Sequence, residues 1–175
     1  MYKIQKTKFY GLFIIKLDYK SDERGYFVKN FRSDFLKNNK LNFKIKEINI
    51  SYNKLKGTLR GMHYQSNPFS ETKIVQCLSG KIHDMVIDLR KKSPTYGRSF
   101  SYQLSEDDGK LIFIPKGFAH GYQTLKPKTL IQYYVDQKYN KKYESGIYYD
   151  DPEFALKWPL KVSNISKKDL NWKIR

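Results

Sequence analysis

Short runs in which hydrophobic and polar positions alternate recur along this chain, and they predict β-strands. In residues 44–52, Ile48 and Ile50 alternate with Glu47, Asn49 and Ser51. Because successive side chains of a strand point to opposite faces, this period of two predicts a half-buried strand. The strand then presents the three polar residues together on its other face.

The same pattern predicts further elements, separated by turns that contain glycine and proline. Towards the N-terminus we expect one or two edge strands in residues 1–20, a charged turn that enters a strand at 22–27, and a short helix at 33–39 with Ser33 as its N-cap. Further on we expect a hairpin at 73–89 that turns at Ser79-Gly80, strands at 111–114 and 118–125 around Pro115-Lys116-Gly117, a strand at 129–135, and a helical turn at 166–170.

Many short strands with little helix indicate an all-β sandwich or barrel, in one domain that spans residues 1–175. Among these folds, a jelly roll encloses a cavity that inward-facing side chains can line. A jelly roll would place His63, Lys73, Tyr133 and one face of residues 47–51 around one pocket.

Composition adds an aromatic content of 16%, which also favours strands over a helical bundle. The net charge is +17, which is compatible with nucleic acid, an anionic membrane or an anionic small substrate. However, only six of the basic residues are arginines, the lysines are scattered, and neither a basic arm nor zinc-finger spacing occurs. We therefore expect no nucleic-acid partner.

The single cysteine, Cys77, excludes an internal disulfide, and its apolar surroundings favour a packing role over a nucleophilic one. The apolar run at 11–15 is too short for a signal-peptide core or a membrane span. We expect a cytoplasmic protein with no membrane partner.

Residues 57–65 concentrate groups suited to chemistry between two predicted strands. Gly57 and Gly61 allow a tight turn and a close approach to the backbone. Arg60 offers a fork of donors that suits phosphate or carboxylate, and His63 can exchange a proton near neutral pH. Alone, a loop histidine and a surface arginine explain this stretch as well.

The three histidines, His63, His83 and His120, lack the spacing of a metal-binding cupin. Tyr64 and Gln65 follow His63, so the usual His-x-His pair is missing, and we expect no metal. The chain also lacks a His-Glu-x-x-His motif, a glycine-rich phosphate loop and a Gly-x-Ser-x-Gly elbow.

A metal-free acid–base set remains. In this set His63 is a candidate base, Lys73 a cation, Tyr133 a weak acid, and Asp169 a group that could orient an imidazole. Each of these residues alone has a plainer structural explanation, as a surface lysine, a core tyrosine or a capping aspartate.

In sequence order, these motifs resemble the dTDP-4-dehydrorhamnose 3,5-epimerase family, which comprises cupin-fold enzymes of nucleotide-sugar biosynthesis. The resemblance covers about residues 8 to 171, and it rests on segments 22–25, 49–51, 59–65, 73–75, 88–90, 93–97, 114–122, 133, 150–152, 158–159 and 166–169.

The resemblance implies a role for each matching residue. His63 matches the family's base and Asp169 its partner, Tyr133 matches the acid on the opposite face of the sugar, and Lys73 matches the residue that holds the C4 oxygen. Implied substrate-binding positions are Arg24, Phe27, Lys29, Glu47, Asn49, Ser51, Arg60, His120, Tyr139, Glu144 and Lys168. The resemblance further implies an all-β, cupin-type jelly-roll barrel with a few short flanking helices, no metal or organic cofactor, and a homodimer whose subunits share strands.

Two departures from the family pattern concern the nucleotide. Lys29 stands where the family usually has glutamate, and Glu47 stands where it usually has glutamine. We therefore expect recognition of the nucleotide to differ from the dTDP case.

The implied activity inverts C3, C5 or both in a nucleotide-linked 4-keto-6-deoxy sugar. The keto group acidifies the neighbouring hydrogens, histidine is a suitable base, and a lysine can stabilise the enolate. A 3,4-ketoisomerase is a competing candidate, although such enzymes tend to carry a second histidine where Gln65 stands here. A carbohydrate-binding cupin without catalysis and a nucleic-acid-binding protein are the remaining candidates.

Overall fold

The computed structural model describes residues 2–174, so Met1 and Arg175, the ends of the expected domain, lie outside the described residues. Strands dominate this part of the chain, and only two short helices accompany them. The strands are β1 (Lys3–Lys6), β2 (Phe13–Lys16), β3 (Lys20–Asp22), β4 (Gly25–Phe27), β5 (Glu47–Asn53), β6 (Leu59–Gln65), β7 (Lys73–Ser79), β8 (Lys81–Asp88), β9 (Ser99–Ser105), β10 (Lys110–Ile114), β11 (Phe118–Thr124), β12 (Thr129–Val135) and β13 (Glu144–Gly146). The helices are α1 (Ser33–Asn38) and α2 (Lys167–Leu170).

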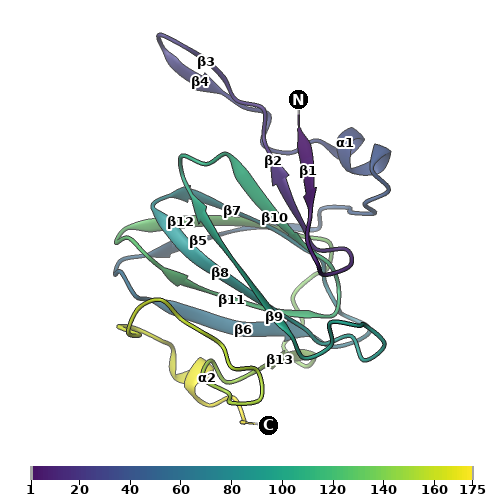
Figure 1. The fold of residues 1–175 in the computed structure, drawn as a ribbon, viewed down its shortest axis with the longest axis vertical. Helices are drawn as coiled ribbons and strands as arrows, with labels where there is room; N and C mark the ends of the chain where they lie inside the picture. The colour runs from purple at the N-terminus through teal and green to yellow at the C-terminus, as the bar shows by residue number, and fades with distance from the viewer. Residues whose placement is uncertain (1, 175) are drawn as a thin grey trace.

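Two antiparallel sheets face each other and form the body of the molecule (Figure 1). One has six strands in the order β1-β2-β10-β7-β12-β5, and the other has five in the order β13-β6-β11-β8-β9. The main hydrophobic core lies between them, where Val75 and Ile131 of one sheet pack with Ile82 and Val86 of the other. This arrangement confirms the prediction of an all-β jelly roll with short flanking helices, although the sheets do not close into a barrel.

Part of the outer face of each sheet is also covered. Leu36 of α1 belongs to a second apolar cluster, together with Ile74 of β7 and Tyr134 of β12. On the other sheet, Met85 of β8 packs in a third cluster with Phe154, from the segment after β13. Hydrophobic burial on both sides makes the two sheets a rigid support for side chains that face the space between them.

The predicted hairpin at 73–89 is wrong, because its two strands belong to different sheets. β7 pairs with β10 and β12, whereas β8 pairs with β9 and β11. Gly80 makes the turn with a φ of +83°, and a Cβ there would lie 2.4 Å from the Thr129 hydroxyl oxygen. The turn therefore carries the chain from one layer to the other, as jelly rolls require, since each strand finds its partners far away in sequence.

The alternation in β5 is confirmed, but the buried side is the opposite of the usual one. Ile48 and Ile50 are 55% and 65% exposed, while Glu47, Asn49 and Ser51 turn towards the space between the sheets. This inversion follows from a polar interior at this end of the sheets, where the Ser51 and Tyr122 hydroxyls lie 2.8 Å apart.

Both predicted helices are present, and one cap differs from the prediction. Arg32, not Ser33, is the N-cap of α1, and it makes no side-chain capping bond; its guanidinium instead pairs with Asp34. The helical turn at 166–170 is confirmed as α2, because Ser166 accepts a hydrogen bond from the Asp169 N–H as its N-cap.

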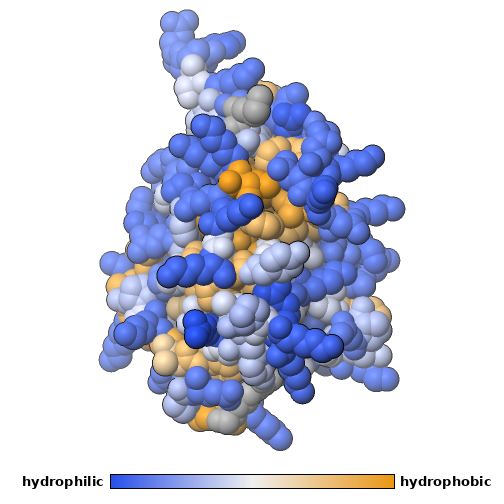
Figure 2. Space-filling view, turned by 45° about the vertical axis from the view of Figure 1, so that its right-hand side comes forward, coloured by the Kyte–Doolittle hydropathy of each residue, from blue (hydrophilic) through white to orange (hydrophobic). Residues whose placement is uncertain are grey.

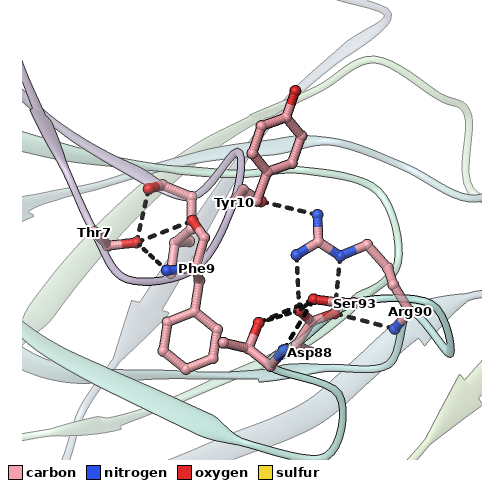
Figure 3. Close-up of polar contacts among 8 residues, drawn as sticks. Thr7, Phe9, Tyr10, Asp88, Arg90 and Ser93 are labelled. Atoms are coloured by element: carbon pink, nitrogen blue, oxygen red, sulfur yellow. Dashed lines mark hydrogen bonds and ion pairs between the residues drawn. The ribbon is translucent and has the colours of Figure 1, made fainter.

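A polar cluster at the end of β8 ties distant turns together (Figure 3). The buried Asp88 carboxylate accepts hydrogen bonds from the Arg90 guanidinium and from the hydroxyls of Ser93 and Thr95. The Arg90 guanidinium also donates to the Tyr10 carbonyl at 2.8 Å, which attaches the β1–β2 turn to this end of β8.

The β3–β4 hairpin projects away from the two sheets (Figure 1), and all of its residues are exposed. Hydrophilic side chains cover most of the face seen in Figure 2, in keeping with the lysine-rich composition. No helix within residues 2–174 is long and apolar enough to cross a membrane.

Candidate active site

His63 and Asp169 form a hydrogen-bonded pair at the edge of the space between the sheets. His63 lies on β6 and Asp169 on α2, and the His63 Nε2 is 2.6 Å from the Asp169 Oδ1. The histidine side chain is 29% exposed and the carboxylate only 3%, so the pair opens to solvent through the imidazole. Burial alone would raise the pKa of Asp169, but the hydrogen bond and charge of His63 and the Gly61 N–H lower it.

Two hydrogen bonds from β6 hold α2 and the chain just before it. The Leu59 N–H donates to the Asn164 carbonyl at 2.8 Å, and the Gly61 N–H donates to the Asp169 Oδ2 at 3.3 Å. Gly61 is needed for the fit of β6 against β11, since a Cβ there would lie 2.6 Å from the Gly121 Cα. The glycine-containing stretch singled out in the sequence is thus the strand that receives the Asp169 carboxylate.

Lys73 and Tyr133 stand on the opposite wall. Lys73 lies on β7 and Tyr133 on the neighbouring β12, both in the six-stranded sheet, whereas His63 belongs to the five-stranded sheet. The three side chains line one cavity of about 140 Å³ between the sheets. The Lys73 ammonium is held 3.0 Å from a Glu71 carboxylate oxygen, and both side chains are nearly buried.

The Tyr133 phenol is held in its protonated form. Burial raises the pKa of Tyr133, and the neighbouring Tyr122 and Glu71 raise it further, against the lowering effect of Arg60. The phenol therefore carries its proton at neutral pH, as a candidate acid must.

A second histidine–carboxylate pair faces the same cavity. His120 of β11 is paired in register with His63 of β6, and its Nε2 lies 2.7 Å from the Asp84 Oδ2 on β8. The sequence reasoning missed Asp84, and also Tyr122, which lines the cavity two residues after His120. The period of two could have placed Tyr122 on the face of His120, but nothing local links Asp84 to that histidine.

A wider cavity of about 340 Å³ adjoins the first, and His63, Lys73 and Tyr133 line both. Its walls carry Glu47, Asn49, Tyr139, Glu144 and Lys168. Glu144 joins two of these groups, because it accepts a hydrogen bond from the Tyr139 hydroxyl at 2.9 Å and lies 2.6 Å from the Lys168 ammonium. Burial alone would raise the pKa of Glu144, but the Lys168 ammonium and the Tyr139 hydroxyl lower it.

Arg60 is held at the junction between cavities. It lines the 140 Å³ cavity and a further hollow of about 470 Å³ beside α2, and its Nε donates to the Asn53 Oδ1 at 2.9 Å. A cation at this position can contact a substrate that extends from one cavity into the next.

The structure does not bring every sequence-predicted residue to these cavities. Arg24, Phe27 and Lys29 lie on or just after the projecting β3–β4 hairpin, and the Arg24 side chain is 84% exposed. His83 lies on the far side of its sheet, where its ring packs edge-on against Trp158. Cys77 is buried, and burial raises the pKa of its thiol to about 12, in agreement with a packing role.

Metal ligands do not gather in the described part of the chain, since residues 2–174 hold no cluster of three or more His, Cys, Asp or Glu side chains arranged around one point. A separate concavity of about 690 Å³ lies by the loop after α1, with Phe13, Phe113 and Lys116 in its lining. That lining contains no histidine, and the candidate proton-transfer residues line the smaller cavities instead.

Comparison with known proteins shows the family of this chain. The model of the family described as dTDP-4-dehydrorhamnose 3,5-epimerase matches residues 6–174. The chain belongs to this family of isomerases. A curated relative of that name from Methanothermobacter thermautotrophicus is 37% identical over 175 residues, which cover 98% of this chain and 94% of the relative.

Solved structures of family members have the same fold. The dTDP-4-dehydrorhamnose 3,5-epimerase of Bacillus anthracis, solved with TDP and PPi bound, is 35% identical, with full coverage of both chains and a TM-score of 0.97. The Legionella pneumophila epimerase, solved in complex with dTDP-4-keto-L-rhamnose, is 34% identical, with a TM-score of 0.94 over 99% of this chain and 93% of that one. The predicted cupin-type fold is therefore confirmed.

Proposed function

We propose that this protein inverts C3, C5 or both in a nucleotide-linked 4-keto-6-deoxy sugar, through an enolate intermediate. The observation that carries the proposal is the placement of His63 on one wall of the cavity and of Tyr133 and Lys73 on the other. Inversion needs a base and an acid on opposite faces of a flat carbanion, and two facing sheets supply both.

His63 removes the proton from the sugar. With the Nε2–H donated to Asp169, Nδ1 carries the lone pair that takes the proton from C3 or C5. The electron pair of the broken C–H bond forms a C=C bond to C4, and the carbonyl electrons move to the C4 oxygen. Asp169, whose lowered pKa keeps it charged, stabilises the imidazolium that forms.

The Lys73 ammonium donates a hydrogen bond to the C4 oxygen and stabilises the enolate. One such donor to an oxyanion contributes about 3–4 kcal/mol in other enzymes. Tyr133 then delivers its proton to the opposite face of the carbon, which restores the carbonyl with inverted configuration. The Tyr133 phenolate and the His63 imidazolium return to their starting states by exchange with solvent.

Deuterium incorporation tests this proposal directly. We would incubate the protein in deuterated water with dTDP-, GDP- and CDP-linked 4-keto-6-deoxy sugars, and locate the exchanged carbons by NMR. We expect deuterium at C3, C5 or both, together with an epimeric product. No deuterium at either carbon with any sugar would reject the proposal, and equal binding of all three nucleotides would reject altered nucleotide recognition at Lys29 and Glu47.

The same samples distinguish two of the competing functions, and chromatography on DNA distinguishes the third. A 3,4-ketoisomerase would give a 3-keto sugar with a different carbonyl signal. A carbohydrate-binding protein would bind the sugar without turnover. A nucleic-acid-binding protein would show a steeply salt-dependent retention on DNA.

We further propose that the protein acts as a homodimer in which the β3–β4 hairpin of one subunit completes the nucleotide site of the other. Support comes from the exposure of Arg24 and Phe27, which line none of the cavities of their own chain described above. Co-expressed R24A and H63N chains should then regain activity, because one mixed site keeps both residues. Two variants that stay inactive together would contradict the shared site.

A further inference from the structure

Trp172, the second residue after α2, packs on Gly146 and beside His63. A Cβ built on Gly146 would lie 2.1 Å from the Trp172 Cε2 and 2.4 Å from its Nε1, so the indole lies directly on the glycine. Its ring also meets the His63 ring edge-on, with 6.4 Å between the centroids and an angle of 70°. No cavity described above includes Trp172 in its lining.

Gly146 is the residue of β13 that pairs with His63 of β6. Its φ is not in the left-handed region, so the backbone would accept a side chain here. The absence of a Cβ therefore serves one purpose, which is to make room for the indole. The indole therefore packs against β13, which pairs with β6, the strand that carries His63.

α2 depends on such an anchor, because it comprises only four residues and one turn. A helix this short has no stability of its own in water. The Leu59–Asn164 hydrogen bond holds the chain just before α2. The large apolar residue of α2, Leu170, is 44% exposed, so it does not hold the helix to the sheet. Trp172 provides the attachment on the far side of Asp169.

We propose that Trp172 is a positioning residue, which by packing on Gly146 holds α2, and so Asp169, in register with His63. This inference rests on the proposed function of His63 as the base. A general base must lie within a fraction of an ångström of its productive position, so a small shift of Asp169 reduces turnover more than substrate affinity.

Four variants test this role by kinetics. We expect W172A to lower kcat by roughly tenfold to a hundredfold with little change in KM, and W172F to recover most of the loss, because a phenyl ring can still pack on the glycine. G146A should resemble W172A, because its Cβ expels the ring. The double variant G146A/W172A should be no slower than W172A, because the added Cβ has no indole left to displace.

Several outcomes would overturn the proposal. They are wild-type kcat in W172A, a change confined to KM, and losses of G146A and W172A that multiply in the double variant. If W172A fails to fold, the comparison of W172F with G146A/W172F decides. A phenyl ring leaves more room on Gly146 than an indole does, so G146A should lower kcat less in the W172F background than in the wild type. An equal loss of kcat in both backgrounds would contradict the proposal.

Histidine NMR gives a readout that does not need activity. The chain has three histidines, and a second tryptophan, Trp158, meets His83 in a similar edge-on geometry, at 6.1 Å and 72°. W172A and G146A should shift the ring signals of His63 and leave those of His83, while W158F should do the reverse. Unchanged His63 signals in W172A would refute the positioning role, whether or not the protein proves to be an epimerase.

Discussion

The His63 Nε2 and the Asp169 Oδ1 lie 2.6 Å apart, although 106 residues separate them in the chain. The contact joins a strand of the five-stranded sheet to a one-turn helix near the end of the described residues. In the proposed mechanism it leaves the other ring nitrogen of His63 as the proton acceptor, and Asp169 is the buried counter-charge of this base.

The substitution D169N should therefore lower kcat by roughly a hundredfold or more, since it removes the charge that stabilises the imidazolium. The KM should change much less, because the Asp169 side chain is only 3% exposed and acts on the substrate through His63. Steady-state kinetics would measure both constants. D107N is the matched control, because Asp107 is an exposed aspartate outside the cavities, and a comparable loss in D107N would contradict this assignment.

The substitution K73A should slow proton abstraction more than it weakens binding. Lys73 is expected to contact the C4 oxygen when negative charge develops on it, so its loss should lower kcat by a factor equivalent to about 3–4 kcal/mol. Deuterium wash-in rates measure the step itself, and ligand titration measures affinity. The exposed Lys91 offers a control in K91A, and an effect of K73A on KM alone would contradict the enolate role.

The substitution Y133F should uncouple proton exchange from inversion. His63 still removes the proton and can return a deuteron to the same face, but no acid remains on the opposite wall. We expect deuterium in recovered substrate and at least about a hundredfold less epimer, which NMR can measure in one sample.

Y134F is the control for Y133F, because the Tyr134 hydroxyl accepts a hydrogen bond from Asn30 in the apolar cluster on the outer face of its sheet. It should retain wild-type inversion. Equal losses of exchange and of inversion in Y133F would show that Tyr133 does not act as the separate acid.

The Asp88 cluster in Figure 3 should make folding stability depend on acid pH. Burial opposes ionisation, but hydrogen bonds from Arg90, Ser93 and Thr95 lower the pKa of Asp88 to about 2. The ionised Asp88 carboxylate therefore contributes about 2 kcal/mol to the free energy of unfolding. This contribution is present above pH 4 and is lost as the pH falls towards 2.

We expect D88N to lower the free energy of unfolding at pH 7 by about this amount, and the gap to wild type to narrow as the pH falls towards 2. Urea titrations over this range would measure it. D22N is the control, because Asp22 forms its ion pair with Arg24 on the exposed β3–β4 hairpin and its loss should change stability little. A gap of constant size at all pH values would contradict the prediction.

Local sequence patterns predicted much of the fold. Alternation placed Glu47, Asn49 and Ser51 on one face of a strand, and Ser166 marked the start of α2, because backbone geometry and capping act over a few residues. The resemblance of the ordered motifs to a known family pointed to His63, Lys73, Tyr133 and Asp169 from the sequence alone.

Other features depended on residues far away in sequence. The segment 73–89 looks like a hairpin, yet its strands separate into two sheets, because each buries apolar side chains against partners that no local pattern names. Asp84 meets His120 only because β8 lies beside β11, and the inward side of β5 is polar only because a polar cavity lies opposite it.

The amino-acid sequence alone determined where many of the strands and turns occur and which residues are candidates for proton transfer, because these follow from side-chain type and from neighbours a few residues away. The tertiary structure decided that His63 and Tyr133 meet across one cavity from different sheets, and that Arg24 and Phe27 do not reach it. Such placement depends on how two sheets pack over a shared core, and that packing is a property of the whole chain.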